Sequence, residues 1–448
     1  MGTTDTAVPT RVAFAYGTGQ LGAQIFRDTP AVLLPLFMTT MLGVAPWIAG
    51  LVVLVPKLWL IACDPLMGAW SDRVKPSRGR TPFLLAGAIL TSLTFVALFW
   101  HTGYSSATMA AVVTCALFFV GSTAFSMFSV PYLAIGSELS PDPHQRTRVM
   151  MYRLNFMTLG VVVGVGAAQP LMAAFGGGAA GWRAMGLVFG LLCIGTMLVT
   201  AIGLKGVKLI EGAAVQGNFL SQLKQVGKNK PFRILLTAHF IQSVGQASSY
   251  TVIAFIYLYA VQAVWIILPF VLVMSVVAIA SQPVWVAMSR RFGKERCYVA
   301  AMLGWTLVTA SWFFVKPADD VVFAGLGTQH ILVLVRAVVI GVFNASFIML
   351  ALSMLTDTIA YERERTGSAN EGVFSGIFSA AEKLAFALGP VIAGVVMSLY
   401  GFRESTGGMV EQTPEAIRGI VLLYSLVPVA TQLVALAVFS RYRLPKSA

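Results

Sequence analysis

Twelve long apolar runs constrain the fold of this chain more than any other feature of its sequence. A helix rises about 1.5 Å per residue, so about 20 apolar residues cross a hydrocarbon core about 30 Å thick. The runs do not alternate in polarity as the strands of a membrane barrel do. We therefore predict an all-α membrane protein with twelve transmembrane helices. The predicted spans are 13–40, 46–69, 81–101, 108–135, 149–174, 182–204, 232–259, 264–289, 297–316, 329–356, 372–400 and 418–440.

The scarcity of charge agrees with this prediction. Only 11% of the residues are charged and 57% are hydrophobic, whereas about 25% of an ordinary soluble domain is charged. A cleavable signal peptide is the alternative interpretation of the first run, but this run is too long and contains Arg27 and Asp28. We expect it to be a retained helix.

Basic residues are distributed unevenly among the connections. Of the 31 Lys and Arg residues, 22 lie in the amino-terminal segment, the even-numbered connections and the carboxyl-terminal tail, 4 lie in or beside the odd-numbered connections, and 5 lie within spans. The positive-inside rule then predicts that both termini are cytoplasmic. The net charge of +13 is thereby explained by orientation, without a nucleic-acid partner.

A polar connection at 205–230 divides the helices six and six. "GAWSDRVK" after the second helix is echoed by "VAMSRRFGK" after the eighth, which indicates an internal repeat. We predict a six-helix half at 1–204, a cytoplasmic connector at 205–230 and a second six-helix half at 231–448. This arrangement is that of the major facilitator fold, whose halves rock around a site near the bilayer midplane.

Several charged residues interrupt the predicted spans. An ionised side chain at mid-bilayer costs about 3 kcal/mol on insertion scales, so such residues usually face a cavity and serve a function. For Arg27 and Asp28, a neutralising tie between helices remains the alternative, and Arg336 has no assigned role. The charged residues within the spans are Arg27, Asp28, Lys57, Asp64, Arg153, Arg336, Glu382 and Lys383.

Asp64 is the candidate for coupling transport to a cation. Lys57 and Asp64 are seven residues apart and so share one face of the second helix, with Trp59 close by. A carboxylate in a protein cavity can exchange a proton or, with several further oxygen ligands, hold sodium. Leu60, one turn earlier, offers no oxygen, and Cys63 offers only a soft thiol. We therefore expect a proton rather than sodium.

Four stretches resemble one family. They are "CDPLMGAWSDRVKPSRGRTP", "VPYLAIGSELSPDPHQRTRVMMYR", "SMLTDTIAYERERTGSANEG" and "AAEKLAFALGP". With them the chain resembles the melibiose permease group of glycoside, pentoside and hexuronide cation symporters. The resemblance implies cation-coupled uptake, an ion site between the second and fourth helices, and a substrate site between the two halves.

The resemblance also implies roles for individual residues. Asp64 matches the cation-site aspartate of the family, and we assign cation coupling to Asp64, Cys63 and Ser126. Arg153 and Lys383 match a basic residue each in the fifth and eleventh helices, and Tyr132 lies in the Pro-Tyr motif. The predicted substrate-binding residues are Gln24, Arg27, Asp28, Lys57, Trp59, Phe125, Ser129, Tyr132, Arg153 and Lys383.

Departures from melibiose permease narrow the expected solute. Leu60 replaces a second cation-site aspartate, and Ala23 and Gln24 replace the lysine and aspartate that grip the galactoside. Ser129 replaces a sugar-binding aspartate, and Leu133 a tryptophan. Galactoside binding is therefore not expected. Arg153 and Lys383, which match basic residues of the family, favour an anionic or amphipathic solute such as a uronide. The family also resembles the lysophospholipid symporters, so a lipid-like or peptide-like solute remains an alternative.

Charged residues of both signs lie between the tenth and eleventh helices. We predict that Asp357, Glu362 and Arg365 form a gate with the loop motif after the second helix, in contacts that exist in only one state of the transporter. The loop-motif residues are Asp72, Arg73 and Arg80. A solvated loop is the alternative interpretation.

These observations predict a symporter, coupled to protons rather than sodium, that imports a sugar derivative or related organic solute by alternating access. A symporter of a lysophospholipid-like or peptide solute is one alternative, and a membrane sensor or scaffold that transports nothing is another. The four histidines are scattered and no nucleophile motif accompanies them, so we expect neither an enzyme nor a metal or other cofactor. We expect a monomer among the lipids of a bacterial inner membrane.

Overall fold

The computed structural model describes residues 8–140, 142–207, 227–318, 320–323, 325–366 and 371–443. These residues are almost entirely helical, and apart from one isolated bridge between Phe323 and Leu326 they contain no β structure. The predicted all-α fold class is therefore confirmed. Most of the predicted connector, residues 208–226, lies outside the described residues.

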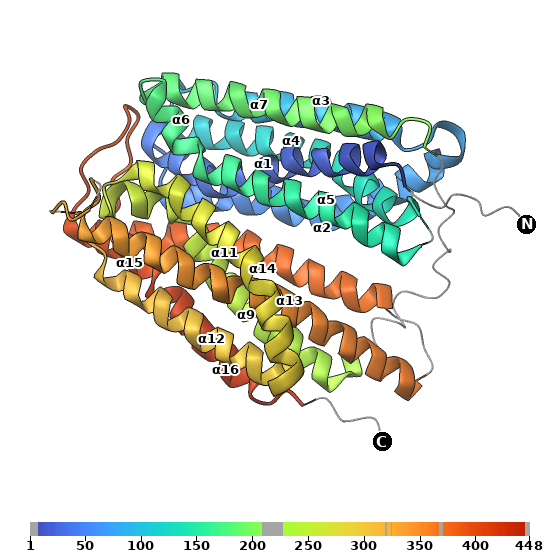
Figure 1. Ribbon diagram of the computed structural model, residues 1–448. Helices are drawn as coiled ribbons and strands as arrows, with labels where there is room; N and C mark the ends of the chain where they lie inside the picture. Colours follow the sequence, from blue (N-terminus) through green and yellow to red (C-terminus); the bar gives the residue numbers. More distant parts are fainter. Residues whose placement is uncertain are drawn as a thin grey trace, which may run out of the picture. The chain divides into compact units, whose positions relative to one another are not determined.

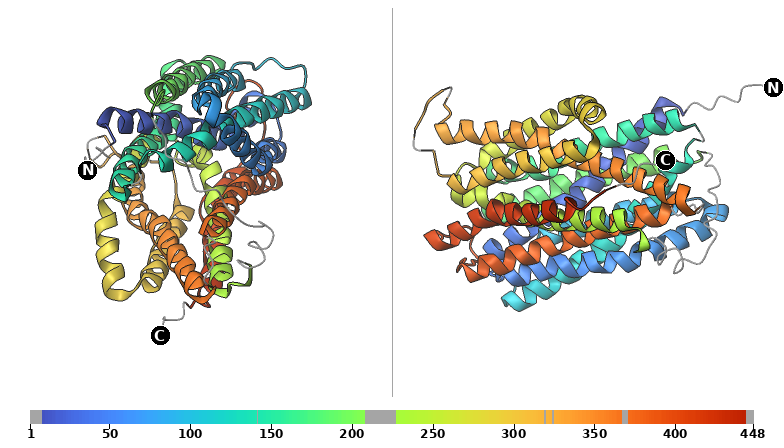
Figure 2. Two further views of the ribbon diagram at one scale, coloured as in Figure 1. Left: turned by 90° about the vertical axis from the view of Figure 1, so that its right-hand side faces the viewer. Right: turned by 90° about the horizontal axis from the view of Figure 1, so that it is seen from below.

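The chain forms two compact units. The described part of the first comprises residues 8–140 and 142–207 together with Arg403–Glu411. Within it, α1 packs against α5 and α7, and α4 packs against α2 and α3 (Figures 1 and 2). Its helices are α1 (Thr10–Met41), α2 (Pro46–Arg78), α3 (Thr81–Leu98), α4 (Ala107–Glu138), α5 (Pro143–Val161), the π-helix η1 (Val162–Gly166), α6 (Ala168–Ala174) and α7 (Gly178–Gly203).

Glycine allows α1 to lie close to its neighbours. A Cβ at Gly17 would meet the backbone of Tyr152 in α5 at 2.9 Å, and a Cβ at Gly22 would meet the carbonyl oxygen of Cys193 in α7 at the same distance. Small residues at such positions are typical of packed membrane helices, because close backbone contact replaces the hydrophobic driving force that lipid cannot supply.

The second unit comprises residues 227–402 and 412–443 of the described chain. In it α9 packs against α14 and α16, and α13 packs against α11 and α12. Its helices are α9 (Lys230–Thr251), α10 (Ile253–Phe255), η2 (Ile256–Ala260), η3 (Val264–Ile266), α11 (Ile267–Phe292), α12 (Lys294–Ala310), η4 (Ser311–Phe314), α13 (Thr328–Thr366), α14 (Glu371–Leu399), α15 (Pro414–Tyr424) and α16 (Leu426–Phe439).

By length and composition, ten helices of the described chain could cross a membrane. They correspond to ten of the predicted spans. The first and seventh predicted spans correspond to α1 and to α9 with α10 and η2, which are helical but are not among these ten.

Two helices extend further than their apolar runs predict. α2 continues to Arg78, where Gly79 ends it with a φ of 67°, so Asp72 and Arg73 lie on the helix rather than in a loop. α13 likewise continues to Thr366 and carries the predicted gate residues of the second unit. Hydropathy marks where a helix leaves the apolar layer, whereas the helix itself ends where the backbone requires it.

Candidate functional site

The predicted cation-coupling residues lie together between α2 and α4. The Ser126 hydroxyl donates to Asp64 Oδ1 at 2.6 Å, and the Asp64 side chain is half-buried. Cys63 is buried and interacts with both residues. One turn earlier, Trp59 Nε1 donates to Thr123 Oγ1 at 3.0 Å. The acid therefore lies at a polar contact between two helices.

A hydrogen-bonded series of side chains runs along α1. Gln20 Nε2 donates to Gln24 Oε1 at 3.2 Å, and Gln24 Nε2 donates to Asp28 Oδ2 at 2.6 Å. Arg27 Nε donates to the other carboxylate oxygen of Asp28 at 3.0 Å. Gln20, Gln24 and Asp28 are all buried, and their four-residue spacing places them on one face of the helix. We call Gln20, Gln24, Arg27, Asp28 and Arg153 the polar ladder.

Arg153 joins the ladder from α5. Its Nε donates to Gln20 Oε1 at 2.9 Å, and its guanidinium carbon lies 5.9 Å from the centre of the Tyr132 ring. Tyr132 is fixed in turn, because its hydroxyl donates to the Tyr16 carbonyl at 3.0 Å and its ring stacks on that of Tyr16. The ladder thus connects α1 and α5 through polar side chains.

Lys57 of α2 interacts electrostatically with Asp28 and Arg27. The structure therefore groups five predicted substrate-binding residues around α1: Gln24, Arg27, Asp28, Lys57 and Arg153. The group carries three cations and one carboxylate.

Sequence reasoning missed Gln20. It is a neutral residue, and its four-residue spacing from Gln24 was the signal that could have indicated a shared polar face.

The remaining predicted binding residues are more dispersed. Phe125 stacks on Phe26, with ring centres 5.1 Å apart, and Ser129 is half-buried on α4. Lys383 belongs to the second unit, where it is exposed on α14 beside Glu382. Among the described residues, no group of three or more His, Cys, Asp or Glu side chains could hold a metal ion.

Arg336, which had no role from sequence, stabilises the end of α12. Its Nε and Nη2 donate to the hydroxyl and the carbonyl oxygen of Ser311, at 3.0 and 2.9 Å. Its guanidinium carbon also lies 5.0 Å from the centre of the Trp312 ring. The contacts of this buried arginine join α13 to the 3-10 turn η4.

Two predicted gate residues of the first unit, Arg80 and Asp72, form an ionic network with Glu138 and Lys75, in which Arg80 and Glu138 are buried. Arg80 donates to both carboxylate oxygens of Glu138, at 2.7 and 3.3 Å, and forms an ion pair with Asp72 at 2.7 Å. Lys75 pairs with Glu138 at 3.0 Å. Burial opposes the charge of Arg80, but its hydrogen bonds to Glu138 and Asp72 outweigh this effect and raise its pKa. Arg73, the third predicted gate residue of this unit, follows Asp72 on α2 and is exposed.

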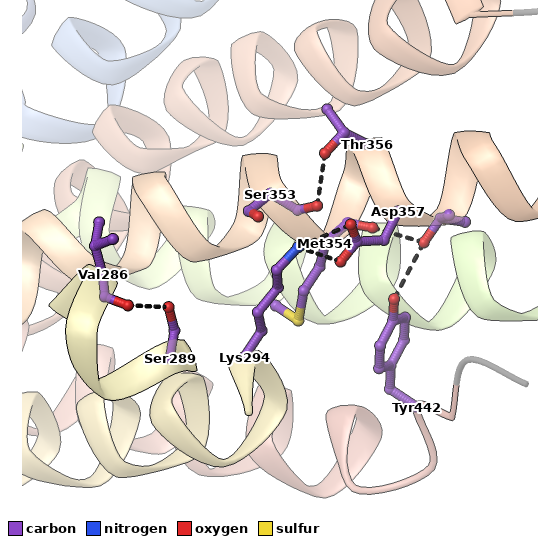
Figure 3. A network of polar contacts seen from close by, with 9 residues as sticks. Val286, Ser289, Lys294, Ser353, Met354, Thr356, Asp357 and Tyr442 are labelled. Carbon is purple, nitrogen blue, oxygen red and sulfur yellow. Dashed lines mark hydrogen bonds and ion pairs between the residues drawn. The ribbon is translucent and has the colours of Figure 1, made fainter. Parts of the chain in front are cut away.

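The second unit contains a related pair (Figure 3). Lys294 Nζ donates to both oxygens of Asp357, at 2.8 and 2.6 Å. Each of these residues lies 219 positions after its counterpart in the pair of Lys75 and Glu138, so the echo in sequence extends to a contact in space. One turn further along α13, Glu362 is buried and pairs with Arg365 at 2.9 Å. The gate between the two sets of charges remains a prediction.

The chain is 23% identical to the putative glycoside/cation symporter YagG of Escherichia coli, over 96% of this chain and 91% of the relative. It is 25% identical to a putative 2,3-dihydroxypropane-1-sulfonate exporter of Salmonella typhimurium, over 96% and 93% of the two chains.

Among solved structures, the fold matches a bacterial homologue of the human lysosomal transporter Spinster, with a TM-score of 0.71, 14% identity and full coverage of both chains. The sequence model of a family described as MFS/sugar transport protein matches residues 15–446. The chain therefore belongs to the MFS/sugar transport protein family, whose members are membrane transporters rather than enzymes.

Proposed function

We propose that this protein is a proton-coupled symporter that imports an anionic sugar derivative, with Asp64 carrying the proton and the polar ladder with Lys57 receiving the anion. The observation that carries the proposal is the charge balance around α1. Arg27 pairs with Asp28, Lys57 interacts electrostatically with both, and Arg153 joins the same series of side chains through Gln20. A group with more cationic than anionic side chains attracts anions, so a substrate with a carboxylate or sulfonate group fits this site.

Two relatives each support one part of the proposal. One is named a glycoside/cation symporter, which supports a sugar derivative and a cation, and the other, named an exporter, is named for a sulfonate, which is an anion of the proposed class. Arg is well suited to such groups, because its planar donors match the geometry of an oxyanion.

A proton is the coupling ion that the surroundings of Asp64 favour. Its carboxylate accepts from a serine hydroxyl, and the adjoining side chain is the thiol of Cys63. Hard cations prefer several oxygen ligands. The thiol of Cys63 and the side chain of Leu60, which packs beside it, provide none. An ionised Asp64 accepts a hydrogen bond from the Ser126 hydroxyl, and a protonated Asp64 can itself donate a hydrogen bond.

Electrostatics links the proton to the anion. Seven residues of helix separate Lys57 from Asp64 by about 10 Å. At this distance and an effective dielectric constant of about 20, two unit charges interact by about 1.7 kcal/mol. Protonation of Asp64 removes a negative charge and so raises the affinity for an anion at Lys57 by about tenfold to twentyfold. By reciprocity, the bound anion favours the protonated acid to the same degree.

Gradient-driven uptake tests the proposal. Purified protein in vesicles should accumulate a radiolabelled hexuronate or sulfonated sugar when an inward proton gradient is imposed, and should ignore the matching neutral hexose. Lys57→Gln should weaken apparent affinity for the anion by about tenfold, while Glu415→Gln, at the exposed start of α15, should leave it unchanged. Uptake driven by sodium alone, or equal uptake of the neutral sugar, would contradict the proposal.

A further inference from the structure

An apolar groove of about 620 Å³ lies between the start of α1 and the end of α7. Gly195 has no side chain and a Cβ there would meet no atom within 4 Å, which leaves space in the groove, whereas α1 and α7 lie close together where Gly203 faces Ala15. The nine lining residues, which include one basic and no acidic side chain, are Thr10, Arg11, Phe14, Ala15, Gly195, Leu198, Val199, Ile202 and Gly203.

The groove opens away from the core of the first unit. Phe14, Val199 and Ile202 are 51, 46 and 63% exposed. Val199 and Ile202 lie on α7, which is long and apolar enough to cross a membrane, and Phe14 lies on α1, which packs against α7. Hydrocarbon is the solvent of such a surface, so an acyl chain is the occupant whose chemistry matches it.

Basic side chains gather at one end of the groove. Arg11 lines it in the first turn of α1 and is exposed. Thr10, another lining residue, accepts a hydrogen bond from Arg148 of α5. Lys205 is exposed two residues beyond Gly203, where α7 has ended. Basic residues beside a cavity between membrane helices are the usual recognition element for anionic lipid headgroups.

We propose that this groove binds an anionic phospholipid, with an acyl chain along Phe14, Leu198 and Val199 and the phosphate beside Arg11. The apolar wall supplies contact with the chain, and the basic end supplies the preference for negative charge. This site is separate from the polar ladder, and the proposal holds whatever solute the protein transports.

Lipid retention by the full-length protein tests the charge requirement. In native mass spectrometry from neutral detergent, the protein should retain phosphatidylglycerol in preference to phosphatidylcholine with the same chains. Arg11→Gln should weaken binding of phosphatidylglycerol about fivefold, the effect of one basic residue near a membrane surface. Arg183→Gln makes the same charge change at the opposite end of α7, where Arg183 contacts Trp100, and should have no effect.

A second variant tests the groove itself. A Cβ at Gly195 meets no atom within 4 Å, so Gly195→Leu should fold normally while its side chain fills the groove. It should lower retention of both lipids, whereas Arg11→Gln should lower only that of phosphatidylglycerol. Unchanged retention in either variant would overturn the proposal. Displacement of the lipid by glycerol phosphate at equal concentration would also overturn it, because the headgroup alone would then account for binding.

Discussion

Removing the Glu138 carboxylate should destabilise the protein far more than removing that of Asp72, although both bind Arg80. The side chains of Arg80 and Glu138 are 4 and 10% exposed, whereas that of Asp72 is 67% exposed. Glu138→Gln leaves a buried guanidinium and the partly buried ammonium of Lys75 without their shared carboxylate. Breaking a buried pair in this way costs about 3 to 5 kcal/mol, but an exposed pair contributes at most about 1 kcal/mol.

The pair of Lys294 and Asp357 provides an internal reference, because its side chains are 37 and 36% exposed. We expect the loss of stability to fall in the order Glu138→Gln, Asp357→Asn, Asp72→Asn. Thermal unfolding of the three purified variants in one detergent measures it. If 1 kcal/mol shifts the midpoint by about 2 to 4 °C, Glu138→Gln should lower it by at least about 6 °C and Asp72→Asn by less than about 4 °C. Equal shifts for Glu138→Gln and Asp72→Asn would refute the reasoning from burial.

Three further substitutions test other parts of the structure. Gln20→Leu removes the ladder partner of Arg153 and should weaken anion binding about tenfold, the value of a hydrogen bond to a charged group; unchanged affinity in equilibrium binding would contradict the role of the ladder. Gly22→Ala should lower thermal stability by about 1 to 3 kcal/mol, because its Cβ meets the backbone of α7, whereas Gly195→Ala should not. Arg336→Gln should lower stability by about 1 to 3 kcal/mol through its lost hydrogen bonds while leaving anion affinity intact; the opposite pattern would place Arg336 in the transport site.

The helices follow from the sequence because long apolar runs have few structural solutions in a bilayer. Their ends do not follow as well. The polar turns from Ser71 to Arg78 suggest a loop after the second span, yet α2 continues through them until Gly79. A helix that leaves the membrane loses its apolar pattern without losing its backbone hydrogen bonds, so hydropathy places the end of α2 too early.

Residues of the candidate site are conspicuous in the sequence where a charge interrupts a span, as at Asp64 and Arg153. Glu138 carries no such signal, because its role depends on Arg80, which lies 58 residues earlier in the chain. Gln20 is inconspicuous for the same reason, since only the packing of α5 on α1 brings Arg153 to it. Partners that are distant in sequence become visible only when the helices are packed.

The most direct test of the central proposal is to count the protons that enter vesicles with each anion. Wild-type protein should alkalinise a weakly buffered medium when the anionic sugar is added, and should accumulate that sugar against its gradient. Asp64→Asn should abolish both the proton movement and the accumulation, yet still exchange internal for external sugar. Proton-linked accumulation by Asp64→Asn equal to that of the wild type would contradict the assignment of Asp64 as the proton carrier.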